Sequence, residues 1–204
     1  MNTYKAIIFD LGKVIFDLSF DRVFQFWAHA SGRPYAEIKS RFQFDNTFDK
    51  FEKNAITPKE FRAEISQRLG LTLTDKIFDE GWCALYLDTY FGIDNVLTNL
   101  KEQYQLVALT NTNSIHSKVW NIKYAHTLQH FQKIFSSHKL KERKPDAKAY
   151  QIVLDYLQVE PQQAVFLDDN IDNIMAAEKL GIKAILVTST EQMTAELQTM
   201  DLLS

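Results

Sequence analysis

The chain has 204 residues, of which 46% are hydrophobic, and a formal net charge of -3. This length and composition indicate a globular protein with a sizeable core, either one domain with an insertion or two small domains. The small charge and the lack of a polybasic tract disfavour a nucleic acid or a membrane surface as partner. No apolar run approaches the roughly 20 residues that span a bilayer, and no signal sequence precedes the first predicted strand, so we expect a cytoplasmic protein.

The one cysteine of the chain, Cys83, excludes an intrachain disulfide framework. Its neighbours Trp82, Ala84 and Leu85 are apolar, which indicates a packed thiol rather than a nucleophile. The five histidines show no metal-ligand spacing with acids or with the cysteine. His116 is the histidine nearest to a proposed site, three residues after Asn113.

Short β-like runs alternate with stretches of helical periodicity from Gly92 onward. Such alternation predicts parallel strands joined by helical crossovers on both faces of one sheet, which is a doubly wound α/β fold. The predicted strands are residues 5–9, 105–109, 133–135, 164–167 and 183–187.

The interval between Asp17 and Phe91 shows no convincing strand, and its apolar residues recur at helical spacing. One helix start is well marked, because Thr57 can cap the helix and Glu60 completes a capping box. Pro58 suits the first helical position, Gly70 ends the segment, and a second helix start is expected at Thr74.

We therefore predict two domains: an α/β core formed by residues 1–16 and 92–204, and an inserted small α-helical cap domain formed by residues 17–91. The insertion follows the loop after Asp10 directly, so it emerges beside the predicted site and suits a lid. A helical packing unit without substrate contact is the alternative. Its aromatic residues are expected mainly in a core, namely Phe42, Phe44, Phe48, Phe51 and Trp82.

Acidic residues follow two of the predicted strands. Asp10 comes directly after one strand, and Asp168 and Asp169 follow another. Carboxyl ends of parallel strands are where open α/β sheets carry out chemistry. Three carboxylates in one place need a cation, and Mg²⁺ prefers such oxygen ligands, with the Gly12 carbonyl as a further one. Taken alone, Asp168 and Asp169 also fit a turn and N-cap pair.

Three further positions supply groups for a phosphate. Thr110 and Asn111, at the end of a third strand, offer a hydroxyl, an amide and backbone N–H groups. Lys144 precedes a proline in a predicted strand-to-helix loop, where its ammonium can bridge phosphate and nucleophile, although lysines in basic runs are usually solvated. Asn173, one helical turn after Asp169, is expected to orient Asp169 or a metal-bound water.

These residues resemble the haloacid dehalogenase-like hydrolase superfamily, in its helical-cap subfamily, along almost the whole chain. The resemblance rests on four motifs in order, which are residues 9–14, 109–111, 143–145 and 165–170. It implies that Asp10 is the nucleophile, that Thr110 and Lys144 bind phosphate, and that Asp168 and Asp169 bind Mg²⁺. Within the superfamily, the motifs are most similar to those of bacterial α-D-glucose-1-phosphate phosphatases.

The sequence departs from most phosphatases of this superfamily at Gly12, where they carry an aspartate that protonates the leaving group. A general acid contributes roughly 10²–10⁴-fold to rate. The α-D-glucose-1-phosphate phosphatases also have glycine there, and a sugar 1-phosphate leaves comparatively easily.

The resemblance therefore predicts a Mg²⁺-dependent phosphatase that hydrolyses a small phosphorylated metabolite, such as a hexose 1-phosphate, through an aspartyl-phosphate. We expect a monomer or a weak homodimer. Three alternatives remain open: a silent binding or regulatory protein, a phosphotransferase or mutase, and a dehalogenase. The adjacent acids Asp168 and Asp169 argue against a dehalogenase, and the acid missing at Gly12 argues against a mutase.

Overall fold

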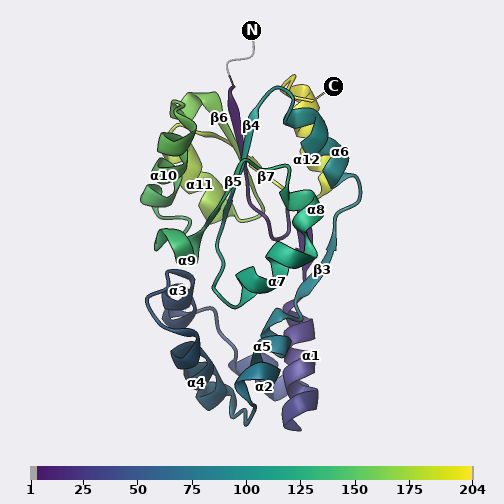
Figure 1. The fold of residues 1–204 in the computed structure, drawn as a ribbon, viewed down its shortest axis with the longest axis vertical. Coiled ribbons are helices and arrows are strands. Elements are labelled where there is room, and N and C mark those ends of the chain that lie inside the picture. The colour runs from purple at the N-terminus through teal and green to yellow at the C-terminus, as the bar shows by residue number, and fades with distance from the viewer. Residues whose placement is uncertain (1–3, 204) are drawn as a thin grey trace.

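A five-stranded parallel sheet is the centre of the computed structural model, which describes residues 4–203 (Figure 1). The strand order is β5-β4-β1-β6-β7, and all four pairings are parallel. The predicted doubly wound fold is confirmed, with strand ends within one residue of those expected. The strands are β1 (Ala6–Phe9), β4 (Gln105–Thr110), β5 (Lys133–Ser136), β6 (Ala164–Asp168) and β7 (Lys183–Leu186).

Helices cover both faces of this sheet because alternate strand residues point to opposite sides. In β1, Ile7 and Phe9 enter one hydrophobic core while Ala6 and Ile8 enter the other. Helices of the first core are α6 (Ile93–Leu100), α7 (His116–Lys123), α8 (Ala125–Leu128) and α12 (Thr190–Thr199). Helices of the second are α10 (Ala147–Leu157) and α11 (Ile171–Lys179). Two short elements, α9 (Ser137–Leu140) and the 3-10 turn η1 (Pro161–Gln163), complete the connections.

Strand register brings the polar strand ends together. Phe9 pairs with Leu167 on β6 and with Ala108 on β4, so Asp10 follows its strand beside the end of β6. The Asp10 amide donates to the Leu167 carbonyl at 2.8 Å. Two buried strands thus fix the backbone of Asp10.

Five helices between residues 20 and 83 form a helical unit beyond the carboxyl ends of the strands (Figure 1). None of the helices within residues 4–203 has the length and apolar character needed to cross a membrane. The helices of this unit are α1 (Phe20–Ser31), α2 (Tyr35–Arg41), α3 (Asn46–Glu52), α4 (Pro58–Leu69) and α5 (Asp75–Cys83).

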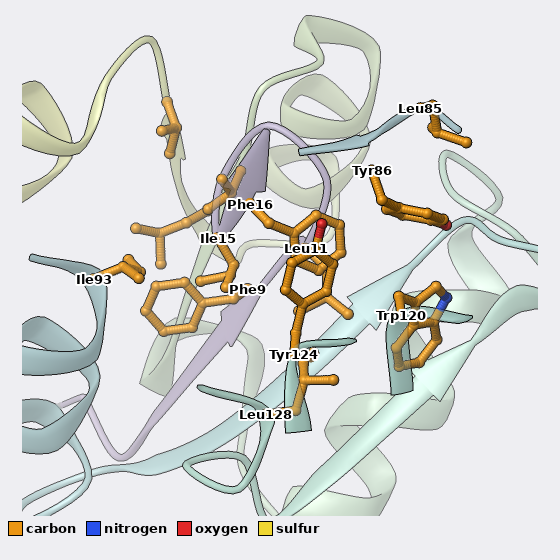
Figure 2. Packing of buried hydrophobic residues seen from close by; sticks show 14 of the residues in the cluster. Phe9, Leu11, Ile15, Phe16, Leu85, Tyr86, Ile93, Trp120, Tyr124 and Leu128 are labelled. Carbon is orange, nitrogen blue, oxygen red and sulfur yellow. The ribbon is translucent and has the colours of Figure 1, made fainter. Parts of the chain in front are cut away.

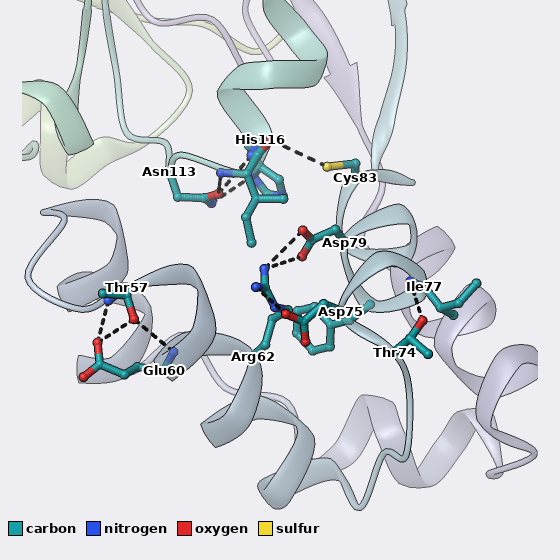
Figure 3. A network of polar contacts seen from close by, with 12 residues as sticks. Thr57, Glu60, Arg62, Thr74, Asp75, Ile77, Asp79, Cys83, Asn113 and His116 are labelled. Atoms are coloured by element: carbon teal, nitrogen blue, oxygen red, sulfur yellow. Dashed lines mark hydrogen bonds and ion pairs between the residues drawn. The ribbon is translucent and has the colours of Figure 1, made fainter.

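The predicted helix ends are confirmed in α4 and α5 (Figure 3). The Thr57 hydroxyl accepts from the Glu60 amide at 3.2 Å, and the Glu60 carboxylate accepts from the Thr57 amide at 2.7 Å. Gly70 ends α4 at a φ of 64°, a left-handed conformation that favours glycine. Thr74 caps α5 by accepting from the Ile77 amide.

The centre of the helical unit is aromatic. Trp27 of α1 and Trp82 of α5 stack at 5.7 Å, and the Trp27 indole donates to the Phe78 carbonyl at 3.1 Å. A side chain at Gly81 would meet the Trp27 ring at 2.4 Å, so glycine permits this close approach. The expectation of core positions is confirmed for Trp82, and also for Phe42 and Phe51.

The prediction of no strand between Asp17 and Phe91 is wrong. An antiparallel ribbon of β2 (Phe16–Leu18) and β3 (Tyr86–Thr89) carries the chain into and out of the helical unit. Three and four residues are too few to show an alternating pattern. The ribbon packs through its aromatics, since Phe16 stacks on Tyr124 at 4.1 Å and meets Tyr86 edge-on (Figure 2). The predicted domain boundary after residue 16 falls within β2.

We predict that Thr57→Ala lowers the free energy of unfolding by about 1 kcal/mol, because it removes the hydroxyl of a two-way capping box. Urea denaturation followed by circular dichroism measures the change. Thr98→Ala is the control, since Thr98 is exposed within α6 and makes no cap. An equal loss of stability in both variants would contradict this role of the capping box.

Candidate active site

A buried lysine lies between two aspartates at the carboxyl edge of the sheet. Lys144 Nζ is 2.8 Å from Asp10 Oδ1 and 2.6 Å from Asp168 Oδ2. The Lys144 side chain is 1% exposed and that of Asp168 is completely buried. The structure thus brings together three residues that are 24 to 158 positions apart in the sequence, as the strand-end prediction required.

Burial makes the charges of this group interdependent. Burial raises the pKa of Asp10 to about 7, against the opposing effect of the Lys144 ammonium, and the Asp168 charge adds to the rise. For Lys144, burial alone lowers the pKa, but the two carboxylates outweigh it and raise the pKa above its usual value. An added positive charge beside Asp10 would therefore favour its ionised form.

Asp168 is held from several directions. Asn173 Nδ2 lies 3.0 Å from both carboxylate oxygens, and the Asn170 amide donates to Oδ1 at 2.8 Å. The Tyr150 hydroxyl in turn donates to the Asn173 carbonyl at 2.9 Å. Asn173 was expected to orient Asp169 or a metal-bound water, but its side-chain amide is hydrogen-bonded to Asp168 instead of Asp169. The role towards a metal-bound water stays a prediction.

The alternative for Asp168 and Asp169, a turn and N-cap pair, is correct in that Asp168 Oδ1 accepts from the Asn170 amide two residues on, but wrong about the N-cap. The N-cap of α11 is Asn170, whose side-chain oxygen accepts from the Asp172 amide at 2.9 Å. The two aspartates therefore precede the cap, and Asp169 lines the same cavity as Asp10.

One group of residues has donor atoms suited to a hard cation. Carboxylate oxygens of Asp10, Asp168 and Asp169 lie within 4.8 Å of one another. Oxygen ligands are those that Mg²⁺ prefers, and three carboxylates against one ammonium leave a surplus of negative charge. The residues present thus fit a divalent ion. Gly12 lines the adjoining cavity, and ligation by its carbonyl stays a prediction.

Asn111 holds the backbone of the lysine loop. Its Nδ2 donates to the Lys144 carbonyl at 2.8 Å, and its Oδ1 accepts from the Lys144 amide at 2.9 Å. Both ends of the side-chain amide are thereby engaged, which leaves Asn111 its backbone N–H and the second N–H of Nδ2 to offer a ligand. Thr110 is buried and lines the cavity, as its predicted role requires.

Ion pairs join α3 of the helical unit to the loop that carries Lys144. Arg143 pairs with Glu52 at 2.9 Å and with Asp49 at 2.7 Å, while Lys53 pairs with Asp146 at 2.6 Å. Sequence reasoning missed Glu52, since a glutamate at the end of a short amphipathic run carries no distinguishing signal.

A cavity of about 400 Å³ lies between the sheet edge and the helical unit. Asp10, Thr110 and Lys144 contribute to its polar side. Phe44 and Phe48 contribute to its apolar side, and the Phe44 side chain is 60% exposed. The expectation of a core position is therefore wrong for Phe44, whereas Phe48 is half-buried and packs against the hydrophobic core while also lining the cavity. They share the helical spacing of core residues, and spacing alone does not show which face is covered.

His116 is held neutral where α7 meets the helical unit (Figure 3). Its Nε2 lies 3.0 Å from the Trp82 carbonyl and its Nδ1 lies 3.1 Å from Asn113 Nδ2. Burial lowers the pKa of His116 to about 3. Nearby Cys83 is half-buried and its pKa rises to about 12 through burial, in agreement with an unreactive thiol.

We predict that His116 makes the protein lose stability in acid. Its pKa falls from an ordinary 6.5 to about 3 on folding, so the unfolded chain binds the additional proton between these values. The stability is complete above pH 6.5 and decreases as the pH falls towards 3, by about 2 kcal/mol at pH 5. Urea unfolding at pH 7 and pH 5 should show this difference between wild type and His116→Gln. Identical pH dependence in the two proteins would contradict it.

Two of the proteins that resemble this chain in sequence are named as phosphatases. A D-ribitol-5-phosphate phosphatase of Bacteroides thetaiotaomicron is 22% identical over 184 residues, which are 88% of this chain and 89% of that one. A sesquiterpene phosphatase of Aspergillus oryzae is 25% identical over 199 residues, 96% of each chain.

The fold has solved counterparts as well. A HAD family enzyme of Bacteroides thetaiotaomicron, in complex with magnesium and inorganic phosphate, superposes with a TM-score of 0.79 at 29% identity, covering 92% of this chain and 96% of that one. The model of the haloacid dehalogenase-like hydrolase family matches residues 4–181. Because that match includes every strand of the sheet except β7, together with all four motifs, this chain belongs to the haloacid dehalogenase-like hydrolase family.

Proposed function

We propose that this protein is a Mg²⁺-dependent phosphatase that hydrolyses a small phosphorylated metabolite through attack by Asp10. The observation that carries the proposal is the buried Asp10–Lys144–Asp168 group at the edge of an accessible cavity. The names of the relatives support phosphate ester hydrolysis. We further propose that it acts as a monomer or a weak homodimer.

The nucleophile in this proposal is the Asp10 carboxylate. Lys144 holds Oδ1 and favours the ionised form that attack on phosphorus requires. Thr110 offers a hydroxyl and Asn111 a backbone N–H to the phosphoryl oxygens, whose negative charge the buried Lys144 ammonium would also offset.

Asp10, Asp168 and Asp169, with the Gly12 carbonyl, would hold Mg²⁺. A bound divalent ion would offset charge on the phosphoryl oxygens and so make phosphorus more electrophilic. Within the protein, Asn173 and Lys144 fix the direction of the Asp168 carboxylate, so the pocket is organised before a ligand enters.

The substrate class we propose is a sugar or sugar-alcohol phosphate, such as a hexose 1-phosphate, whose size suits a cavity of about 400 Å³. A second candidate is a phosphate ester of an apolar alcohol. The aromatic wall of Phe20, Phe44 and Phe48 favours it, because such rings pack against hydrocarbon as well as against a sugar face. A relative named a sesquiterpene phosphatase lends this candidate support.

The test is phosphate release by the purified full chain from a panel of hexose 1-phosphates, D-ribitol 5-phosphate and farnesyl phosphate. We predict release with Mg²⁺, a loss of at least about 1,000-fold in Asp10→Asn, and a comparable loss when a chelator removes the metal. Preference within the panel decides between the two substrate classes.

The control is Asp155→Asn, since Asp155 is exposed on α10 and remote from the cavity lining. It should retain wild-type turnover and so exclude a general effect of substitution. Release that survives in Asp10→Asn, or no release from any ester by the folded wild type, would overturn the proposal. The second result would favour a silent binding protein.

A further inference from the structure

We infer that Glu52, a residue of the helical unit, is the acid that gives a proton to the leaving oxygen of the substrate. The inference rests on the proposed phosphatase function and deepens it. It assigns a catalytic residue to a position outside the sheet edge, at the carboxyl end of α3.

Gly12, two residues after Asp10, has no side chain that could give a proton. A Cβ at Gly12 would lie 2.6 Å from Cδ1 of Leu18, on the ribbon strand β2. Any larger side chain there would have to displace Leu18, which itself lines the cavity. The proton must therefore come from another direction.

Glu52 reaches the cavity from the side on which a leaving group would lie. Its side chain is 6% exposed, and it lines the same cavity as Asp10. Attack by Asp10 on phosphorus is in line, so the departing oxygen points away from the sheet edge and towards the helical unit. A carboxyl group carried by α3 is on that side.

Arg143 fixes the Glu52 carboxyl in place. The Arg143 Nε donates to Oε2 of Glu52 at 2.9 Å, while its NH1 group pairs with Asp49 at 2.7 Å. Two carboxylates therefore share one guanidinium, which limits how far that guanidinium favours the charged form of either. The same arginine is the neighbour of Lys144 in the sequence, so it ties the acid to the phosphate loop.

The protonation state of Glu52 suits an acid at neutral pH. Burial raises its pKa to about 7, Arg143 opposes the rise, Asp49 adds to it, and the more distant Lys144 lowers it. A phosphate ester brings further negative charge into the cavity, which favours the protonated carboxyl. An acid with a pKa close to the working pH gives efficient proton transfer.

Other titratable residues along the cavity wall are engaged elsewhere. Both ring nitrogens of His116 are hydrogen-bonded, Lys13 pairs with Asp17 at 2.5 Å, and Lys144 lies between two carboxylates. The Tyr86 hydroxyl is a poor acid, because burial raises its pKa well above the usual value. Glu52 is the remaining carboxyl of the described lining that is outside the cation-binding group.

The proton balance over the two half-reactions is complete. In the first, a bond forms between Asp10 and phosphorus, the ester P–O bond breaks, and its electron pair takes the Glu52 proton to give the free alcohol. In the second, the Glu52 carboxylate accepts a proton from the attacking water as the Asp10–phosphorus bond breaks. Inorganic phosphate leaves, and both carboxyl groups return to their starting state.

The experiment compares aryl phosphates of similar size, from p-nitrophenyl phosphate to phenyl phosphate, whose leaving groups differ in basicity. We expect Glu52→Gln to lose about 100-fold or more in kcat/KM on phenyl phosphate but less than about 10-fold on p-nitrophenyl phosphate. In the wild type, kcat/KM for phenyl phosphate should fall above pH 7 as Glu52 loses its proton, and this fall should be absent in Glu52→Gln.

Asp49→Asn is the matched control, because Asp49 lies on the same helix and pairs with the same Arg143 but does not line the cavity. Below pH 7, where Glu52 is protonated, it should keep the wild-type dependence on the leaving group, and the loss of the Asp49 charge should only move the fall in kcat/KM to a lower pH. Glu52→Asp, which keeps an acid on a shorter side chain, should give an intermediate dependence and serves if Glu52→Gln fails to fold.

Equal losses on all esters in a folded Glu52 variant, or the same change in Asp49→Asn, would overturn the inference and indicate a purely structural ion pair. These results would leave the proposed function intact, because that fails only if the wild type releases no phosphate or Asp10→Asn retains the activity.

Discussion

The buried ammonium of Lys144, held between Asp10 and Asp168, is the interaction on which the site depends. An unpaired charge is costly in a protein interior, so each of these three groups is stable there only because the others are present. The parallel sheet holds the three charged groups at pairing distance. Strands β1 and β6 are neighbours in register, and Asn111 holds the Lys144 backbone against the end of β4. The same buried ion pairs therefore join the strand ends and position the proposed nucleophile.

The sheet edge supplies one half of the cavity and the helical unit supplies the other. The α3 ion pairs with Arg143 and the neighbouring Lys53–Asp146 pair join these halves beside the lysine loop. In the proposed function, the aromatic wall would meet the organic part of a ligand and the acidic edge its phosphate. A substrate would thus contact both parts of the chain.

The sheet and its acidic edge could be predicted from the sequence. Each buried strand of four to six residues is a run of hydrophobic residues, and polar residues follow directly where the strand ends, as in residues 6–10 and 164–169. The β2–β3 ribbon was missed because it is short and contains Asp17 and Asp88. Glu52 was missed because its importance depends on Arg143, 91 positions away. The hydrogen-bond partner of Asn173 was assigned wrongly because helical periodicity shows which side of the helix Asn173 is on, but does not distinguish Asp168 from the adjacent Asp169.

The carboxylates at the sheet edge outnumber the one buried ammonium, and we propose that a divalent ion neutralises the surplus of negative charge. Calorimetric titration of the full chain with Mg²⁺, without substrate, measures this directly. We predict one ion bound per chain, with affinity reduced at least about 10-fold in Asp169→Asn, which removes one charge but leaves the Lys144 pairs in place. Absence of binding, or equal affinity in wild type and Asp169→Asn, would contradict it.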